Sequence, residues 1–107
     1  MSSKNSDFVA VWEFWVSPGA EAEFEKVYGP EGAWARLFSG HPAYGGTKLV
    51  RDVSAPRRYV TLDSWESRVA YEEFRWLHVE EYRAIDEVCE SLTEREAKIG
   101  EFEVASN

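Results

Sequence analysis

His78 is the residue of this sequence best suited to acid-base chemistry. It lies four residues after Phe74 and four before Tyr82, so a helix through this segment places the three side chains on one face. A neutral imidazole beside aromatic rings could remove a proton from a phenol or hydroquinone, and the resulting electron-rich carbanion can donate an electron to dioxygen. The alternative is a structural histidine whose nitrogens bind a nearby hydroxyl or carbonyl group.

Aromatic side chains are frequent, with five Trp, five Tyr and six Phe among 107 residues. Because such side chains line pockets and interfaces well, their excess favours a cavity or a partner surface in addition to an ordinary core. A flat aromatic substrate would suit such a cavity. The residues expected to form it are Trp12, Phe14, Tyr28, Trp34, Trp65, Phe74 and Tyr82. Taken singly, each is better explained as a core residue.

Charge and motif content argue against several classes of function. The formal net charge of −8 disfavours nucleic acid and anionic lipid as partners, and no apolar run approaches the roughly 20 residues that span a bilayer. Two distant histidines and a single cysteine provide no metal-ligand spacing, so no metal site is expected. The N-terminus lacks the features of a secretion signal, and one cysteine cannot form an internal disulfide, which predicts a cytoplasmic protein.

Strands and helices alternate along one predicted domain, residues 8–104, between a polar tail at 1–7 and a short tail at 105–107. Ser17 and Pro18 are typical of a helix start, and Gly29-Pro30 must divide that helix into two pieces. The expected strands are 8–16, 44–53, 58–63 and 98–104. The expected helical segments are the two pieces within 17–38, a long helix over 67–91 and a short one over 93–97.

This β-α-β-β-α-β order predicts an α+β, ferredoxin-like fold, in which two helices cover one face of a four-stranded antiparallel sheet and the first strand is central. The segment FVAVWEFWV, residues 8–16, is apolar on both faces. The helices can cover only one of these faces, so the other needs a further layer. A second copy of the chain is the simplest source, which predicts a homodimer.

Three segments carry a family resemblance: FWVSPGAEAEFE, HPAYGGTKLVRD and RRYVTLDSWESRVAYEEF. Together they resemble the antibiotic biosynthesis monooxygenase group of dimeric α/β-barrel proteins. The resemblance implies a homodimer whose two sheets face each other, and a ligand pocket between each sheet and its helices. It also implies that Trp12, Phe14 and Val16 face the helices. The residues implied to face the partner sheet are Val11, Glu13 and Trp15.

Several residues keep two interpretations at this stage. Glu13 needs a partner if it lies charged in an apolar interface, and Lys48, Arg51 or Arg58 could supply one. We interpret Glu13 as a pairing or register device in the dimer, with a base in the pocket as the alternative. Trp76 points away from Phe74 and is either an exposed aromatic or an intersubunit contact. His41 precedes a proline in a loop, where a surface position is expected.

Relatives in this group include cofactor-independent oxygenases, haem-degrading oxygenases and proteins without established activity. The haem-degrading branch uses an asparagine on the first strand and a Trp-His pair about ten residues apart, whereas here the strand has no asparagine. Trp76 and His78 lie about 200° apart around a helix. The predicted function is therefore cofactor-independent oxidation of a small aromatic or quinol-type compound, with His78 as proton acceptor. The alternatives are a non-catalytic ligand-binding or structural homodimer and, third, haem degradation.

Overall fold

The computed structural model describes residues 7–106, so the predicted N-terminal tail lies almost entirely outside the described residues, as does Asn107. The strands of the described part are β1 (Phe8–Val16), β2 (Tyr44–Arg51), β3 (Arg58–Trp65) and β4 (Thr93–Glu103). Its helices are α1 (Glu21–Tyr28), α2 (Ala33–Phe38), α3 (Arg68–Leu77) and α4 (Val79–Cys89), with a 3-10 turn at Glu90–Leu92.

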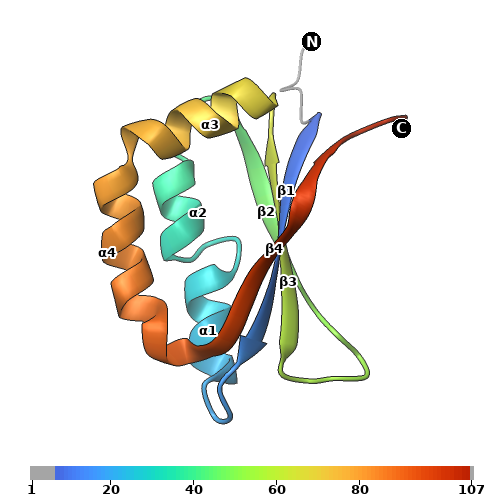
Figure 1. Ribbon diagram of the computed structural model, residues 1–107, viewed down its shortest axis with the longest axis vertical. Coiled ribbons are helices and arrows are strands. Elements are labelled where there is room, and N and C mark those ends of the chain that lie inside the picture. Colours follow the sequence, from blue (N-terminus) through green and yellow to red (C-terminus); the bar gives the residue numbers. More distant parts are fainter. Residues whose placement is uncertain (1–6, 107) are drawn as a thin grey trace.

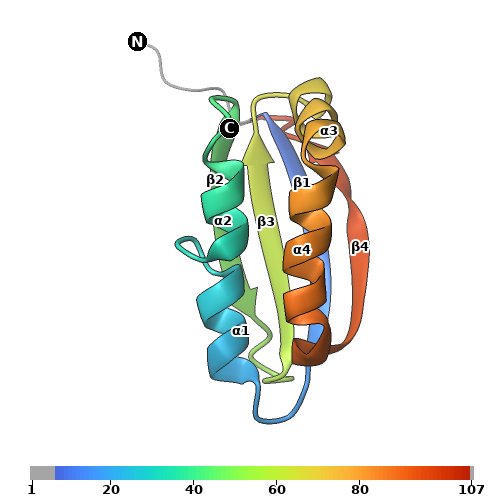
Figure 2. The same ribbon diagram turned by 90° about the vertical axis from the view of Figure 1, so that its left-hand side faces the viewer.

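The four strands form one antiparallel sheet in the order β2-β3-β1-β4, with all helices on one face (Figure 1). Seen from the helix side, α1 and α2 run in one column and α3 and α4 in a second, with β3 visible between the columns (Figure 2). This arrangement confirms the predicted ferredoxin-like α+β fold and the central position of the first strand.

The first helical segment is divided into two pieces, as predicted. Gly32 lies at the break, where a Cβ atom would come within 2.1 Å of the Val27 carbonyl oxygen, so a larger residue would force the turn open. The predicted helix start at Ser17 is wrong, because α1 begins at Glu21 after a turn. In that turn the Ser17 hydroxyl donates to the Ser91 carbonyl oxygen at 3.2 Å instead of capping the helix.

The predicted helix over 67–91 is two helices. Ser67 caps α3 by accepting a hydrogen bond from the Ala70 amide at 3.1 Å, and the helix ends at His78, whose φ and ψ of −121° and 33° are not helical. The apolar residues keep their helical spacing across His78. The pattern therefore predicted one continuous helix where the chain has two. The predicted short helix over 93–97 is also wrong, because these residues pair with β1 as the start of β4.

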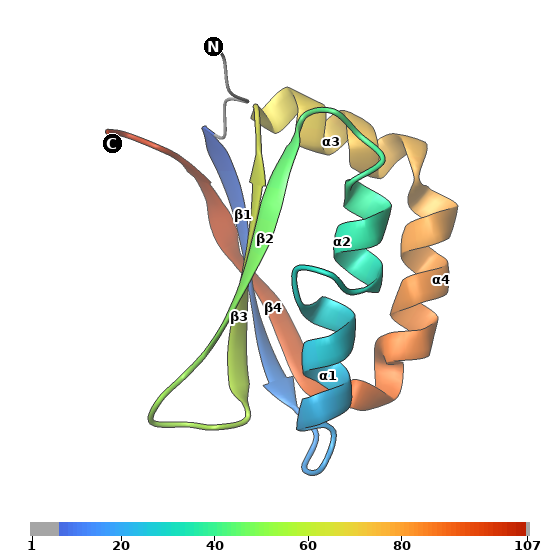
Figure 3. The same ribbon diagram turned by 180° about the vertical axis from the view of Figure 1, so that it is seen from behind.

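The helix-side face of the sheet carries the core, in two clusters of aromatic residues. One surrounds Trp65 and Phe74, and the other surrounds Phe24 and Tyr59. Along β1 the side chains alternate between this core and the opposite face, which no described element covers (Figure 3). The alternation of residues 8–16 was therefore correctly predicted.

Candidate functional site

A pocket of about 100 Å³ lies between the sheet and the two columns of helices. The sheet and both helical columns contribute to its wall. The contributing side chains are the inward residues of the four strands, the first helical column and the facing sides of α3 and α4. The predicted pocket residues that line it are Trp12, Phe14, Tyr28, Trp34 and Tyr82. The further lining residues are Phe38, Thr47, Thr61, Asp63, Tyr71, Arg75, Asp86 and Glu96.

Trp65 and Phe74, predicted to shape the pocket, are instead core residues that are 0% and 1% exposed and are not among its lining residues. The Trp65 ring packs 5.2 Å from that of Phe74 and 5.8 Å from that of Tyr71, between ring centroids. Trp65 thus packs the start of α3 against the end of β3. This is the core position that the sequence offered as the alternative to substrate contact.

His78, the predicted proton acceptor, lies at the junction of α3 and α4 and is not among the residues that line the pocket. Its ring stacks on Phe74 with centroids 4.2 Å apart, and its Nδ1 lies 3.4 Å from Glu81 Oε2. Glu81 has its pKa lowered by its own backbone amide and by the His78 side chain. These contacts fit a residue that packs the bend between the helices.

Asp63 is the carboxylate that the fold brings into the pocket. It is 9% exposed, and none of the ion pairs among residues 7–106 includes it. Burial disfavours the charged form and raises the pKa of Asp63 to about 6, although a hydrogen bond from Thr47 acts in the opposite direction. A group with this pKa can accept a proton near neutral pH.

A short chain of hydroxyl groups holds the Asp63 carboxylate. Thr47 is its cross-strand partner on β2 and donates to Asp63 Oδ1 at 2.6 Å. The hydroxyl groups of Thr47 and Tyr44 lie 2.5 Å apart. Because the Thr47 hydrogen is directed at Asp63, Tyr44 is the donor in this second hydrogen bond. The chain orients one carboxylate oxygen from the β2 side of the sheet.

Arg75 supplies a positive charge to the same pocket. Its guanidinium carbon lies 5.6 Å from the centre of the Tyr71 ring and 5.4 Å from that of Tyr82, so it is held between two aromatic faces. Its Nη1 donates to the Tyr71 hydroxyl at 3.4 Å, and no ion pair of the described residues includes it. The guanidinium therefore remains available to an anionic oxygen in the pocket.

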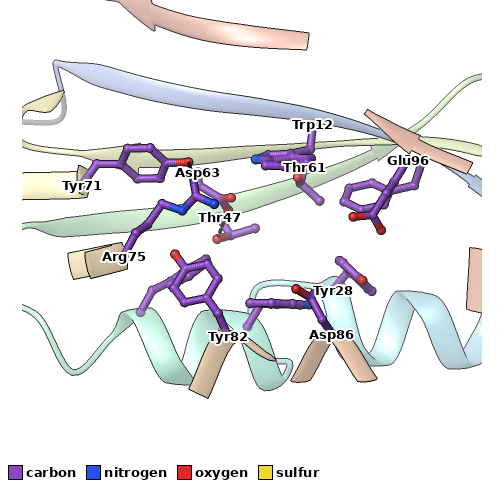
Figure 4. A pocket seen from close by; sticks show the side chains of 13 residues that line it. Trp12, Tyr28, Thr47, Thr61, Asp63, Tyr71, Arg75, Tyr82, Asp86 and Glu96 are labelled. Atoms are coloured by element: carbon purple, nitrogen blue, oxygen red, sulfur yellow. Dashed lines mark hydrogen bonds between the residues drawn. The ribbon is translucent and has the colours of Figure 1, made fainter. Parts of the chain in front are cut away.

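The pocket has charged side chains at both ends. In the close view Tyr71, Arg75 and Asp63 lie toward one end, while Asp86 and Glu96 lie toward the other (Figure 4). Burial raises the pKa of Glu96, and the charge of Asp86 raises it further. Burial likewise raises the pKa of Asp86, which Arg75 partly offsets.

Glu13 and its neighbours occupy the opposite face of the sheet. Of the three cations that the sequence offered as partners, the structure selects Arg58, whose Nε lies 2.5 Å from Glu13 Oε2. Arg58 also pairs with Asp52 at 3.1 Å. Val11 and Trp15 flank Glu13 on this partly exposed face, whereas Trp12 and Phe14 face the pocket.

Two further features bear on chemistry. Among the described residues no group of three or more His, Cys, Asp and Glu side chains is arranged to hold a metal ion. No helix in the same part of the chain is both long and apolar enough to cross a membrane.

The sequence contained a pattern that places Asp63 on the inward face of its strand. The end predicted for that strand hid this pattern. Every second residue of β3 is buried and faces inward, namely Tyr59, Thr61, Asp63 and Trp65. With the strand predicted to stop at residue 63, Asp63 became an end residue rather than part of this inward face. Arg75 follows Tyr71 by four residues, a spacing that places both on one side of α3.

The family model described as antibiotic biosynthesis monooxygenase matches residues 7–88. The chain belongs to this family. Proteins of the family are typically dimeric. No curated protein matches the chain.

Solved structures share this fold. SnoaB from Streptomyces nogalater, a cofactor-independent oxygenase, is 24% identical with a TM-score of 0.74, covering 94% of this chain and 96% of its own. Rv0793 from Mycobacterium tuberculosis is 19% identical with a TM-score of 0.64, covering 95% and 98%. A variant of MhuD with two manganese protoporphyrin IX molecules per active site is 24% identical with a TM-score of 0.66, covering 94% and 96%. At these identities the likeness establishes the fold alone.

Proposed function

We propose that this protein is a cofactor-independent monooxygenase that oxidises a small aromatic or quinol-type compound, with Asp63 as the proton acceptor. The observation that carries the proposal is a buried carboxylate on the wall of an aromatic pocket, bound by a hydroxyl group and by no cation of the described residues. The similarity to SnoaB, itself a cofactor-independent oxygenase, supports the same reaction class.

The proposed reaction begins when Asp63 removes a proton from an acidic C–H group of an anthrone-type substrate or from a hydroxyl group of a quinol. The carbanion, stabilised as an oxyanion beside Arg75, transfers one electron to dioxygen, and the substrate radical and superoxide combine to form a C–O bond. The peroxide takes up a proton and loses water to leave a carbonyl group. One oxygen atom enters the product and the other leaves as water. In an anthrone-type substrate a CH₂ group and O₂ thus become C=O and H₂O, whereas in a quinol a ring C–H and a hydroxyl O–H supply the two hydrogen atoms of the water.

His78 stays a second candidate for the proton acceptor, acting from the helix junction next to Phe74. His78 is not among the residues that line the pocket, which favours Asp63, because a general base must reach the proton that it removes directly or through one water. A non-catalytic ligand-binding dimer is the alternative function, and the same aromatic-lined pocket supports it. Haem degradation is the third, and the similarity to MhuD, a porphyrin-binding relative, favours testing it.

Oxygen uptake with an anthrone or a dihydroxyaromatic compound tests the proposal. We expect Asp63→Asn, which keeps the shape and the hydrogen bond from Thr47, to lower the rate at least 100-fold. Glu13→Gln, the same loss of charge on the opposite face, should leave the rate within twofold. Loss of activity in His78→Ala but not in Asp63→Asn would transfer the role to His78. Binding of a ligand by the unmodified protein without oxygen uptake would favour the binding function. A shift of the Soret band on haem titration would favour haem degradation.

We also propose that two copies of the chain pair through the outer face of the sheet, with Val11, Glu13 and Trp15 in the interface. Exposed or partly exposed apolar side chains from all four strands gather on this face, including Val50 and Phe102 at 42% and 49% exposure. An apolar surface of this extent is typical of a protein interface. The expected particle in solution has twice the 12.3 kDa mass of one chain.

A further inference from the structure

A second cavity adjoins the pocket on the outer side of α3 and α4. This outer groove has a volume of about 610 Å³, and its wall includes Trp76 and Val79. It shares Arg75, Tyr82 and Asp86 with the inner pocket. The same three side chains therefore form the boundary between the two spaces.

The inner pocket is smaller than a cavity that encloses one benzene-sized ring. Its volume is about 100 Å³, whereas an apolar cavity of about 150 Å³ binds a molecule the size of benzene. Pockets that enclose larger organic ligands measure about 300 to 1,000 Å³. A substrate with a second or third ring must extend out of the inner pocket, and the outer groove adjoins it at the shared boundary.

Trp76 gives the outer groove a surface suited to such an extension. Its side chain is 79% exposed, which is unusual for tryptophan, and Val79 beside it is 44% exposed. Neither residue belongs to the two core clusters. A planar group lying over Trp76 would cover apolar surface that the described residues leave in contact with water.

The charges of the groove favour a group without negative charge. Its acidic side chains come from Glu72, Asp86, Glu87 and Glu90, against the two cations Arg75 and Arg83. Arg83 is paired with Glu80 at 3.0 Å and Glu72 with Arg68 at 3.1 Å, which leaves three carboxylates in the groove against Arg75. An anionic extension would meet this excess of carboxylates.

We propose that the outer groove is a second substrate subsite, which holds the part of an elongated aromatic substrate that the inner pocket cannot enclose. The proposal rests on the proposed function for the identity of the reacting carbon, which faces Asp63 in the inner pocket. It predicts that the part of the substrate held in the outer groove is uncharged or cationic. Trp76 is the specificity-determining residue, and Arg75 and Tyr82 lie at the boundary between the subsites.

Calorimetric binding under anaerobic conditions tests this proposal without depending on turnover. The probes are hydroquinone, with one ring, and 1,8-dihydroxyanthraquinone, with three. We expect Trp76→Ala to raise the Kd of the three-ring compound about tenfold and to change that of hydroquinone less than twofold. The matched control is Val88→Ala, which removes a 74% exposed apolar side chain of α4 outside the groove and should change neither.

Other outcomes overturn the proposal. An unchanged Kd for the three-ring compound in Trp76→Ala, or an equal loss for both probes, would remove the groove from substrate binding. Equal affinity for anthraquinone-2-sulfonate and the uncharged compound would contradict the charge selectivity. A smaller particle by light scattering in Trp76→Ala would identify the groove as a contact between copies of the chain. If the selective loss occurs but Asp63→Asn retains full oxygen uptake, the subsite stands and the assignment of Asp63 fails.

Discussion

Two carboxylates on adjacent central strands, Asp63 on β3 and Glu13 on β1, lie on opposite faces of the sheet. Glu13 is bound by the guanidinium of Arg58, which also binds Asp52. Asp63 is bound by the hydroxyl of Thr47 and lies in the wall of a pocket. The two residue types are nearly equivalent, so the difference between them comes from their partners.

The partners set opposite protonation behaviour on the two faces. Around Arg58 the ion pairs favour charge: hydrogen bonds to Glu13 and Asp52 raise the pKa of Arg58, while the Ser54 amide and Arg58 lower the pKa of Asp52. In the pocket, burial raises the pKa of Asp63 to about 6. The first arrangement favours the charged forms of Arg58 and Asp52, and the second allows Asp63 to gain and lose a proton near neutral pH.

The largest expected effect is a gain in the stability of the Asp63→Asn variant at high pH. Because the folded pKa of about 6 exceeds the unfolded value of 3.8, the folded state binds the proton more tightly, so stability falls as pH rises from 4 through 6. Removing the charge should raise the free energy of unfolding at pH 8 by roughly 2 to 3 kcal/mol and by little at pH 3.5. Urea unfolding at the two pH values measures this, and an equal gain at both would refute the buried charge as its cause.

The next effect concerns the outer face itself. Val11 lies between Leu62 of β3 and Gly100 of β4, at the centre of the face that we propose as the dimer interface. Val11→Lys should weaken self-association at least tenfold, because a charge would be buried without a partner. Light scattering over a concentration series measures this. Val88→Lys on the exposed side of α4 is the control, and a 12.3 kDa particle for the unmodified protein would exclude the dimer.

A smaller effect is expected from Thr47, which acts through Asp63. Its hydrogen bond lowers the pKa of Asp63, so Thr47→Val should move the acidic limb of the pH-rate profile to higher pH, by about one unit or less. Thr47→Ser keeps the hydroxyl and should restore the original limb. A lower rate with the limb unmoved would mean that Thr47 only packs in the pocket wall.

The smallest effect is expected from Glu13→Gln in the single chain. The Glu13 and Arg58 side chains are 24% and 32% exposed, so water screens their attraction, and the urea midpoint should fall less than it rises in Asp63→Asn at pH 8. The change should shrink further in 1 M salt, where charge interactions are screened. A loss that salt does not reduce would show that packing, rather than charge, explains the role of Glu13.

The errors in the predicted elements have a common physical origin in contacts between distant parts of the chain. The 93–97 segment reads as helical locally, yet its backbone pairs with β1. The apolar spacing of 67–91 is continuous, yet the chain turns at His78 and packs its ring on Phe74. The extension of β3 to Trp65, which makes Asp63 an interior residue of the strand, likewise depends on pairing with β1 and β2.

The sequence by itself determined the fold class, because hydrophobic alternation, glycine and proline positions and the order of elements are local features. It also placed Trp12 and Phe14 on the helix side of the sheet and Glu13 on the other. Only the tertiary structure decided which polar groups meet in the pocket. Asp63, Thr47 and Arg75 come from three different elements, and the burial that raises the pKa of Asp63 exists only once the helices cover the sheet.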